Sequence, residues 1–201
     1  MKRESPWVSL FRFERVAAPC GEMLVVTDPE DTLCLLHWEA DMDDVVRLLR
    51  RQYGRDDVRL EARGTPSAAR NALEAYVAGD LHAIDAVPVN ARGTAFQQEV
   101  WAALRRIPAG ATLSYSVLAA QLNRSQAARA VGLANGSNPI AVVVPCHRVI
   151  GAHGSLTGYG GGLERKRWLL EHEGVDLSRL ASSKRKRSTT HSPQLALLPT
   201  A

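Results

Sequence analysis

The amino-acid sequence predicts an α/β protein of the α+β type, with a mixed N-terminal domain and a mostly helical C-terminal domain. In the first ninety residues, strand-like and helix-like segments alternate, which indicates a small sheet with helices beside it. In the part that follows, helical segments dominate, and two of them flank a short turn as in a helix-turn-helix. A continuous apolar run at 140–144, followed by a proline, predicts a short buried strand. We therefore expect domains at 1–90 and 91–178, and a basic tail at 179–201.

The elements of the N-terminal domain follow from residue periodicity and turn residues. Strands are predicted at 7–16, 23–27 and 33–38, and amphipathic helices at 41–53 and 67–78. This domain carries no chemical motif. Cys20 and Cys34 lie too far apart for the paired spacing of a structural zinc site, so we expect them to fill space. The domain is expected to support the other one.

The C-terminal domain opens on a capping box, in which Thr94 and Gln97 satisfy each other's free backbone groups. Helices are predicted from this capping box to residue 107, over 115–122 with Ser114 as the N-cap, and over 126–135. The last of these contains small residues and a single arginine, Arg129. Such a helix can approach another surface closely, and an arginine can project from it, although alanine-rich helices are usually packed against the rest of the protein.

Composition excludes several classes of protein. The chain has 201 residues, 45% hydrophobic and 23% charged, which is ordinary for a globular protein. No apolar run reaches the roughly 20 residues that span a bilayer, and the N-terminus lacks the pattern of a secretory signal. Three cysteines at unrelated spacings indicate no disulfide framework. A reducing cytoplasmic compartment without a membrane partner is the expectation.

Charge is distributed unevenly along the chain. Residues 1–90 carry 11 basic and 16 acidic side chains, 91–178 carry nine and five, and 179–201 carry five and none. A basic second half is typical of a protein that meets a polyanion, although chance scatter of surface charge explains the asymmetry equally well. The tail is expected to be disordered and either to attract nucleic acid or to be inert.

Cys146 is the candidate reactive residue. It follows the predicted buried strand and Pro145, and it precedes His147 and Arg148. A neighbouring imidazole or cation lowers the pKa of a thiol and so favours the nucleophilic thiolate. An inert packed cysteine is the alternative, because free cysteine is among the most buried residue types.

Glu173 is a candidate third group for this pair. It ends the predicted helix at 163–173 and shares one helical face with Lys166 and Leu170. A carboxylate faces the unfavourable end of the helix dipole there, so either a cationic partner or solvent is expected to stabilise it.

Several segments, taken together, resemble a known family. They are the stretches at 94–101, 114–132, 135–139, 145–148 and 158–174, in order and at matching spacing. The set resembles the O6-alkylguanine-DNA alkyltransferases, also called methylated-DNA–protein-cysteine methyltransferases. The likeness is close over about 91–176 and looser before that.

The resemblance implies direct-reversal DNA repair in a single turnover. Cys146 would accept the alkyl group from O6-alkylguanine, and from O4-alkylthymine as a second substrate. His147 would take the thiol proton through a water molecule, and Glu173 would hold the imidazole in the required tautomer. Tyr115 would crowd the backbone phosphate and hydrogen-bond the guanine ring as it leaves.

The resemblance also implies a DNA surface and a base pocket. Arg129 would enter the base stack in place of the flipped guanine, with the helix-turn-helix in the minor groove of double-stranded DNA. The neighbouring DNA contacts would be Ser114, Ala127 and Ala128, and the pocket positions would be Asn138, Val149, Tyr159, Gly160 and Lys166. A monomer without a cofactor is implied.

Two features depart from the family pattern. Gly160 stands where some members have serine, so a contact to the guanine oxygen there would come from the backbone. The N-terminal half lacks the cysteine and histidine set with which some members bind zinc, so no metal is implied.

Two other functions remain open at this point. One is a protein that binds alkylated DNA without chemistry, suggested by the helix-turn-helix and basic tail. The other is a cysteine hydrolase built on Cys146 and His147. Adjacent residues of an extended segment point in opposite directions, which argues against a direct dyad.

Overall fold

The N-terminal part is built on a four-stranded sheet in which the first three strands lie side by side in chain order and the fourth pairs with the first. The structure is a computed structural model that describes residues 9–54, 57–178 and 180. The strands are β1 (Ser9–Ala18), β2 (Gly21–Thr27), β3 (Leu33–Trp38) and β4 (Val58–Ala62), in the order β3-β2-β1-β4. β2 pairs antiparallel with both β1 and β3, whereas β4 lies parallel to β1 at the edge.

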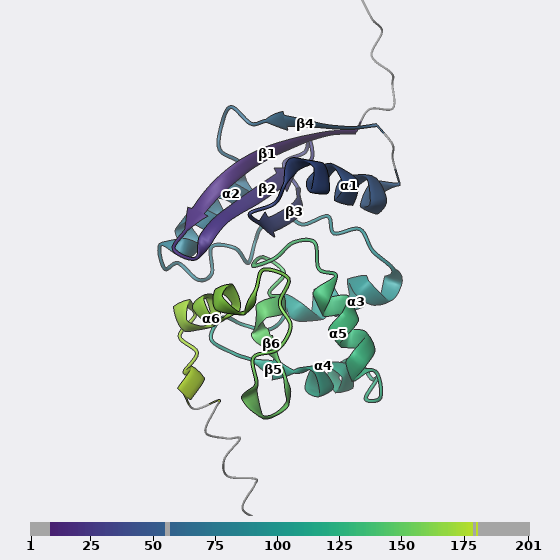
Figure 1. Cartoon of the computed structure of the whole chain (residues 1–201), viewed down its shortest axis with the longest axis vertical. Coiled ribbons are helices and arrows are strands. Elements are labelled where there is room, and N and C mark those ends of the chain that lie inside the picture. Colours follow the sequence, from purple (N-terminus) through teal and green to yellow (C-terminus); the bar gives the residue numbers. More distant parts are fainter. Residues whose placement is uncertain (1–8, 55–56, 179, 181–201) are drawn as a thin grey trace, which may run out of the picture.

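The two faces of this sheet are covered differently, because successive side chains of a strand point to opposite sides (Figure 1). The covering helices are α1 (Met42–Tyr53) and α2 (Ala68–Val77). Leu24 and Val26 share an apolar cluster with α1. Met23 and Val25 belong to a second cluster with α2 and with residues of the C-terminal part. The sheet therefore joins the two halves of the molecule.

The strands at 23–27 and 33–38 and both helices of this part are confirmed, within a residue or two at the ends. The helices begin at side-chain caps, Asp41 for α1 and Ser67 for α2. β4 was not predicted, because Arg59 and Glu61 give it little apolar character. The start predicted for the first strand, at residue 7, lies outside the described residues.

The C-terminal part is mostly helical, which confirms the predicted fold class. Its elements are α3 (Ala95–Leu104), β5 (Leu113–Ser114), α4 (Tyr115–Gln121), α5 (Ala128–Gly136), η1 (Cys146–Arg148), β6 (Val149–Ile150), η2 (Ala152–Gly154) and α6 (Leu163–His172). The helices α4 and α5 form the helix-turn-helix, and α5 packs both on α4 and on α3 (Figure 1). The capping box of Thr94 and Gln97 is present at the start of α3. Over the described residues, no helix has the length and apolar character needed to cross a membrane.

The predicted strand at 140–144 is wrong, although its burial is right. Only Ile140 makes a single bridge, to Leu36 of β3, and the chain then turns. Val142 adopts a left-handed backbone conformation with a φ of 67°, which no strand residue has. A short apolar run does not distinguish a strand from a buried turn. The short strand of the region, β6, follows the cysteine instead of preceding it.

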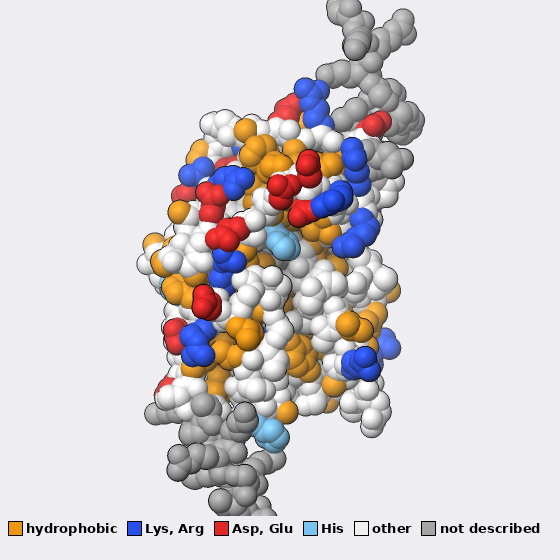
Figure 2. Space-filling view, in the orientation of Figure 1, with side chains coloured by type: hydrophobic (Ala, Val, Ile, Leu, Met, Phe, Trp, Pro, Cys, Tyr) orange, Lys and Arg blue, Asp and Glu red, His pale blue; other side chains and the backbone are white. Residues whose placement is uncertain are grey.

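Both halves of the chain contribute to one apolar core. Val25 and Leu36 of the sheet lie in the same cluster as Val100 of α3, Val131 of α5 and Cys146. On the face shown in Figure 2, acidic side chains gather mainly over the N-terminal part, where basic ones lie among them, and a few basic side chains are seen over α4 and α5. The basic tail lies outside the described residues, apart from residue 180.

Candidate active site

Cys146 begins the 3₁₀ turn η1 and is 5% exposed. Its backbone amide donates to the carbonyl of Val144 at 2.8 Å, and its carbonyl accepts from Nδ2 of Asn135 at 3.4 Å. The turn rather than an extended strand therefore carries the thiol. His147 lies in the same turn, so the two side chains are not held on opposite sides as they would be in an extended strand.

Asn138 ties together the chain that precedes this turn. Its Nδ2 donates to the carbonyls of Val144 at 2.8 Å and Ile140 at 3.3 Å, and its Oδ1 accepts from the amide of Ile140 at 3.0 Å. These bonds satisfy backbone groups that a sheet would otherwise pair. They also hold Val142 in its unfavourable conformation. Asn138 therefore braces the turn that leads to Cys146.

His147, Arg148 and Glu173 form a buried cluster. Nε2 of His147 lies 2.9 Å from Oε1 of Glu173, and both side chains are fully buried. Arg148 donates to the same carboxylate through Nε and through a terminal nitrogen at 2.7 Å, and it also reaches the carbonyl of Ile107 at 2.5 Å. Glu173 therefore has the cationic partner expected at a helix end, while the solvated alternative is excluded.

The hydrogen bond to Glu173 decides which nitrogen of His147 is basic. A carboxylate only accepts, so Nε2 carries the hydrogen and Nδ1 keeps its lone pair. Nδ1 is buried and has no hydrogen-bond partner among the described residues. Burial lowers the pKa of His147, and hydrogen bonding to Glu173 only partly opposes this. The ring is therefore neutral at rest and able to take a proton at Nδ1.

The carboxyl of Glu173 stays ionised in this environment. Burial raises its pKa, but hydrogen bonds and charges from His147 and Arg148 together outweigh burial and bring the pKa to about 2. The hydroxyl of Tyr76 adds another donor, 2.8 Å from Oε1. A fixed negative charge behind His147 can stabilise the imidazolium that forms when it accepts a proton.

The thiol of Cys146 is not ionised at rest, contrary to the expectation from its neighbours in sequence. Burial raises the pKa of Cys146; a hydrogen bond from Asn138, the charge of Lys166 and nearby backbone amides only oppose that rise. A buried charge is costly, and this outweighs the adjacent cations. The site therefore needs a base to generate the thiolate, and His147 is placed in the same turn.

Lys166 is the buried cation that faces the thiol. It is 0% exposed, and its Nζ donates to the carbonyls of Val149 at 2.6 Å and Thr157 at 2.8 Å. Burial lowers the pKa of Lys166 to about 8, and a thiolate at Cys146 opposes this. The backbone carbonyl of Val149 thus fixes the position of the Lys166 ammonium. The ammonium and the thiolate stabilise each other.

Two tyrosines surround the thiol. Tyr115 starts α4 and lies against Gly132 of α5 and the loop at Gly158. Burial raises the pKa of Tyr115, a hydrogen bond with Thr157 partly opposes this rise, and the charge of Cys146 adds to it. Tyr159 accepts a hydrogen bond from Nε1 of Trp38 at 3.0 Å, and its ring meets the ring of His147 edge-on.

The helix-turn-helix residues lie on the outside of this cluster. Ser114 caps α4 by accepting from the amide of Val117, as predicted. Ala127 and Ala128, at the start of α5, are half-buried, and Arg129 is exposed. Arg129 makes no hydrogen bond or ion pair to any residue that the structure describes. It is therefore free to contact a ligand.

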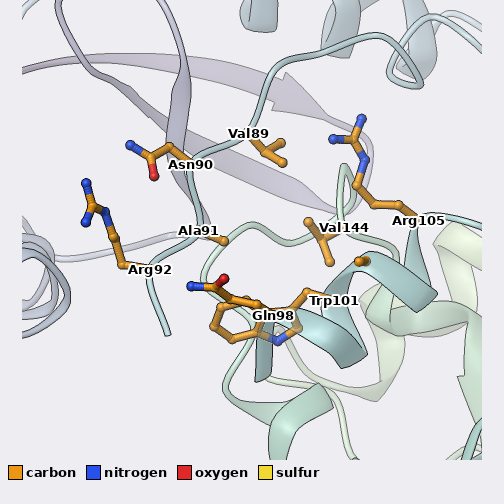
Figure 3. A pocket seen from close by; sticks show the side chains of 9 residues that line it. Val89, Asn90, Ala91, Arg92, Gln98, Trp101, Arg105 and Val144 are labelled. Atoms are coloured by element: carbon orange, nitrogen blue, oxygen red, sulfur yellow. The ribbon is translucent and has the colours of Figure 1, made fainter. Parts of the chain in front are cut away.

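Gly160 is exposed in the loop before α6, with open space where a Cβ would stand. A pocket elsewhere opens between the segment 89–92 and α3 and reaches the back of Val144 (Figure 3). None of the predicted site residues lines it. Within the described ranges, no group of three or more histidine, cysteine or acidic side chains could hold a metal ion.

Tyr76, Trp38 and Asn135 also contact the predicted site residues, although they were not predicted to do so. Tyr76 lies on the buried face of the amphipathic helix α2. A buried tyrosine normally finds a partner for its hydroxyl, so the residue itself was a signal for a polar group behind the helix. Arg148 was noticed as a neighbour of Cys146 but not as the partner of Glu173.

Comparison with known proteins places these features in a family. Residues 95–175 match the family model described as "6-O-methylguanine DNA methyltransferase, DNA binding domain". A methylated-DNA–protein-cysteine methyltransferase from Shigella flexneri is 47% identical over 161 residues, which cover 80% of this chain and 94% of that protein.

Solved structures agree over most of the chain. The crystal structure of Mycobacterium tuberculosis O6-methylguanine methyltransferase is 40% identical, with a TM-score of 0.66 and coverage of 84% of this chain and 98% of that one. The structure of the M. tuberculosis protein in complex with DNA gives a TM-score of 0.63 at 40% identity and covers 85% and 98%. The identity and coverage together show that this chain belongs to the family of methylated-DNA–protein-cysteine methyltransferases.

Proposed function

We propose that this chain repairs alkylated DNA by moving the alkyl group from O6 of guanine to the sulfur of Cys146. The observation that carries the proposal is the arrangement around that sulfur. A neutral buried thiol lies beside a histidine whose Nε2 is bound to an ionised glutamate, and a buried ammonium faces the thiol. Family membership supplies the class of reaction, direct reversal by alkyl transfer to a cysteine.

The reaction balances with the residues present. Nδ1 of His147, through solvent, takes the proton from the sulfur, and Lys166 stabilises the thiolate. The sulfur electron pair forms a bond to the alkyl carbon as the bond from that carbon to O6 breaks. The released electrons go to the guanine, which the hydroxyl of Tyr115 stabilises by a hydrogen bond. Guanine then takes a proton from solvent, and the imidazolium of His147 returns its own.

DNA is the partner named for the M. tuberculosis structure, and the outer face of α5 suits it. A guanine stacked in a duplex cannot reach a buried sulfur, so it must be flipped out at a cost of a few kcal/mol. Ala127 and Ala128 allow α5 to approach the minor groove closely. Arg129 is exposed without a partner among the described residues, and we assign it to the gap that the flipped base leaves.

Replacing Arg129 by alanine should slow repair of duplex DNA by about a hundredfold, because the cost of flipping is no longer offset. Transfer from free O6-benzylguanine, which needs no flipping, should fall less than twofold. Single-turnover rates on both substrates measure the difference. Arg106→Ala, also an exposed arginine, is the matched control for lost charge. Equal losses on duplex and free base would contradict the assignment.

The transfer rate should fall on both sides of neutral pH. At high pH, Lys166 loses its charge above its pKa of about 8, and the thiolate loses its stabilising cation. At low pH, His147 becomes protonated and can no longer accept the thiol proton; burial lowers its pKa, so this limb lies below the ordinary value of 6.5. Single-turnover rates from pH 5 to 10 would check both limbs. An alkaline limb that persists in Lys166→Met would contradict its origin in Lys166.

The product is a thioether, and the described site holds no second nucleophile that could remove the alkyl group from it. One turnover per molecule follows. The test is duplex DNA carrying O6-methylguanine in tenfold excess, with the repaired guanine measured by nucleoside chromatography. Repair should stop at one equivalent of protein. Continued repair would contradict the proposal, and binding without repair would favour a non-catalytic DNA-binding protein.

A cysteine hydrolase is disfavoured by the backbone around the thiol. Such an enzyme needs amide donors for an oxyanion, and the amide of Cys146 already donates to Val144.

We further propose that the protein acts as a monomer in the cytoplasm and binds double-stranded DNA. The boundary between its two domains would lie near residue 90. Sedimentation with and without a duplex tests the monomer.

A further inference from the structure

Tyr76 brings the N-terminal part of the chain into contact with the catalytic cluster. It lies on α2, 0% exposed, and its hydroxyl donates to Oε1 of Glu173 at 2.8 Å. Its backbone carbonyl accepts from Nε2 of His172 at 2.7 Å, and the two rings meet edge-on with centroids 5.1 Å apart. The side chain is therefore fixed both at its ring and at its hydroxyl.

The oxygen that Tyr76 contacts is the same one that His147 contacts. Oε1 of Glu173 accepts from Nε2 of His147 at 2.9 Å and from a terminal nitrogen of Arg148 at 2.7 Å, as well as from Tyr76. Donors that share one oxygen share its negative charge, so removing one strengthens the bonds to the others. Tyr76 is thus placed to weaken the hydrogen bond between Glu173 and His147.

We propose that Tyr76 is a positioning residue for the alkyl transfer, which orients Glu173 from the N-terminal part and limits how strongly that carboxylate attracts a proton to His147. This proposal rests on the proposed function, since it assigns a residue to the same proton transfer. It makes the N-terminal part a contributor to the chemistry as well as to the core. Tyr76 touches no reacting atom.

Tyr76 can act in this way across the working pH range because it remains a neutral donor. Burial raises its pKa, and the charge of Glu173 adds to this, so the hydroxyl keeps its hydrogen. The titratable groups facing Tyr76 are Glu173, Arg148, Tyr159 and His172. Those facing His147 are Glu173, Arg148, Lys166 and Tyr159. Of the two donors that share Oε1 of Glu173 with His147, Arg148 is charged and Tyr76 is neutral.

Removal of the Tyr76 hydroxyl should raise the pKa of His147. Without this hydroxyl, Oε1 of Glu173 carries more negative charge toward His147 and stabilises its protonated form. The pKa of His147 then rises, so its neutral form, which accepts the thiol proton, is lost at a higher pH. A residue that only fills space would not move this limb, because phenylalanine preserves the ring and its packing.

The test compares Tyr76→Phe with wild type in single-turnover transfer from an alkylated duplex between pH 5 and 8. We expect the acid limb to move up by about half a pH unit or more. Tyr53→Phe is the matched control, since it removes a comparable hydroxyl, bonded to the carbonyl of Asn90 at 2.8 Å, from a tyrosine that packs in the other apolar cluster, with α1. That control should leave the limb in place.

A second variant gives the opposite sign and keeps the ring in place. 3-Fluorotyrosine at position 76 is a stronger donor, so the acid limb should move down. Limbs that stay in place in both variants would overturn the proposal, as would equal shifts in Tyr53→Phe. Failure of the wild-type protein to transfer alkyl groups would instead overturn the proposed function, so the two outcomes are distinguishable.

Discussion

Replacing Cys146 by serine is expected to abolish alkyl transfer while DNA binding persists. A serine hydroxyl is far less acidic than a thiol, and neither His147 nor Lys166 can shift its ionisation enough to make it a comparable nucleophile. The substitution keeps the shape of the side chain, and the outer face of α5 is unchanged. Repair of a labelled duplex measures transfer, and fluorescence anisotropy measures binding.

Cys34→Ser is the matched control for that experiment. Cys34 is also fully buried, but its sulfur faces Asp28 and the carbonyl of Thr32 in the N-terminal part. Burial raises its pKa to about 11, which leaves it an unreactive thiol. The control should repair DNA at the wild-type rate. Repair by Cys146→Ser, or its loss in Cys34→Ser, would place the acceptor elsewhere.

Replacing Glu173 by glutamine is expected to lower the free energy of unfolding by about 3–5 kcal/mol, because a buried arginine loses its charge partner. Arg148 is 3% exposed and would keep the carbonyl of Ile107 and the neutral amide oxygen of the new glutamine, but no negative charge. The same change should slow transfer by about 10²–10⁴-fold, since His147 loses the charge that stabilises its protonated form. Urea unfolding at pH 7 and single-turnover kinetics measure the two effects.

Glu171→Gln is the control, because Glu171 is exposed on the last turn of the same helix. It should change stability and rate little. In wild type, the pKa of Glu173 is about 2 in the folded protein, below its ordinary 4.5. Its stabilising contribution is therefore complete above pH 4.5 and lost as the pH falls from there toward 2. A Glu173→Gln variant as stable as wild type would contradict the role of the cluster.

Periodicity and turn residues predicted the order of the elements well, because helices and strands leave regular patterns in the sequence. The run at 140–144 shows where this fails. Its burial was evident from composition, but its conformation depends on Asn138, which bonds three backbone groups that a strand would have paired with a neighbour. No local sequence pattern indicates whether these backbone groups bond to Asn138 or to a neighbouring strand.

The electrostatics of the site were the least predictable feature. His147 and Arg148 beside Cys146 suggested an ionised thiol, yet Arg148 is committed to Glu173, and burial keeps the thiol neutral. Which neighbour a charged side chain faces, and how deeply both lie, depends on packing between segments far apart in the chain. Tyr76 shows the same point, since it meets Glu173 only once α2 and α6 are packed together.

The place where the alkyl group ends tests the central claim most directly. The protein should be incubated with a duplex carrying O6-methylguanine, digested, and its peptides examined by tandem mass spectrometry. We expect one methyl group per molecule, bound to the sulfur of Cys146, with Cys20 and Cys34 unmodified. A methyl group on any other residue, or repaired guanine with an unmodified protein, would contradict the account.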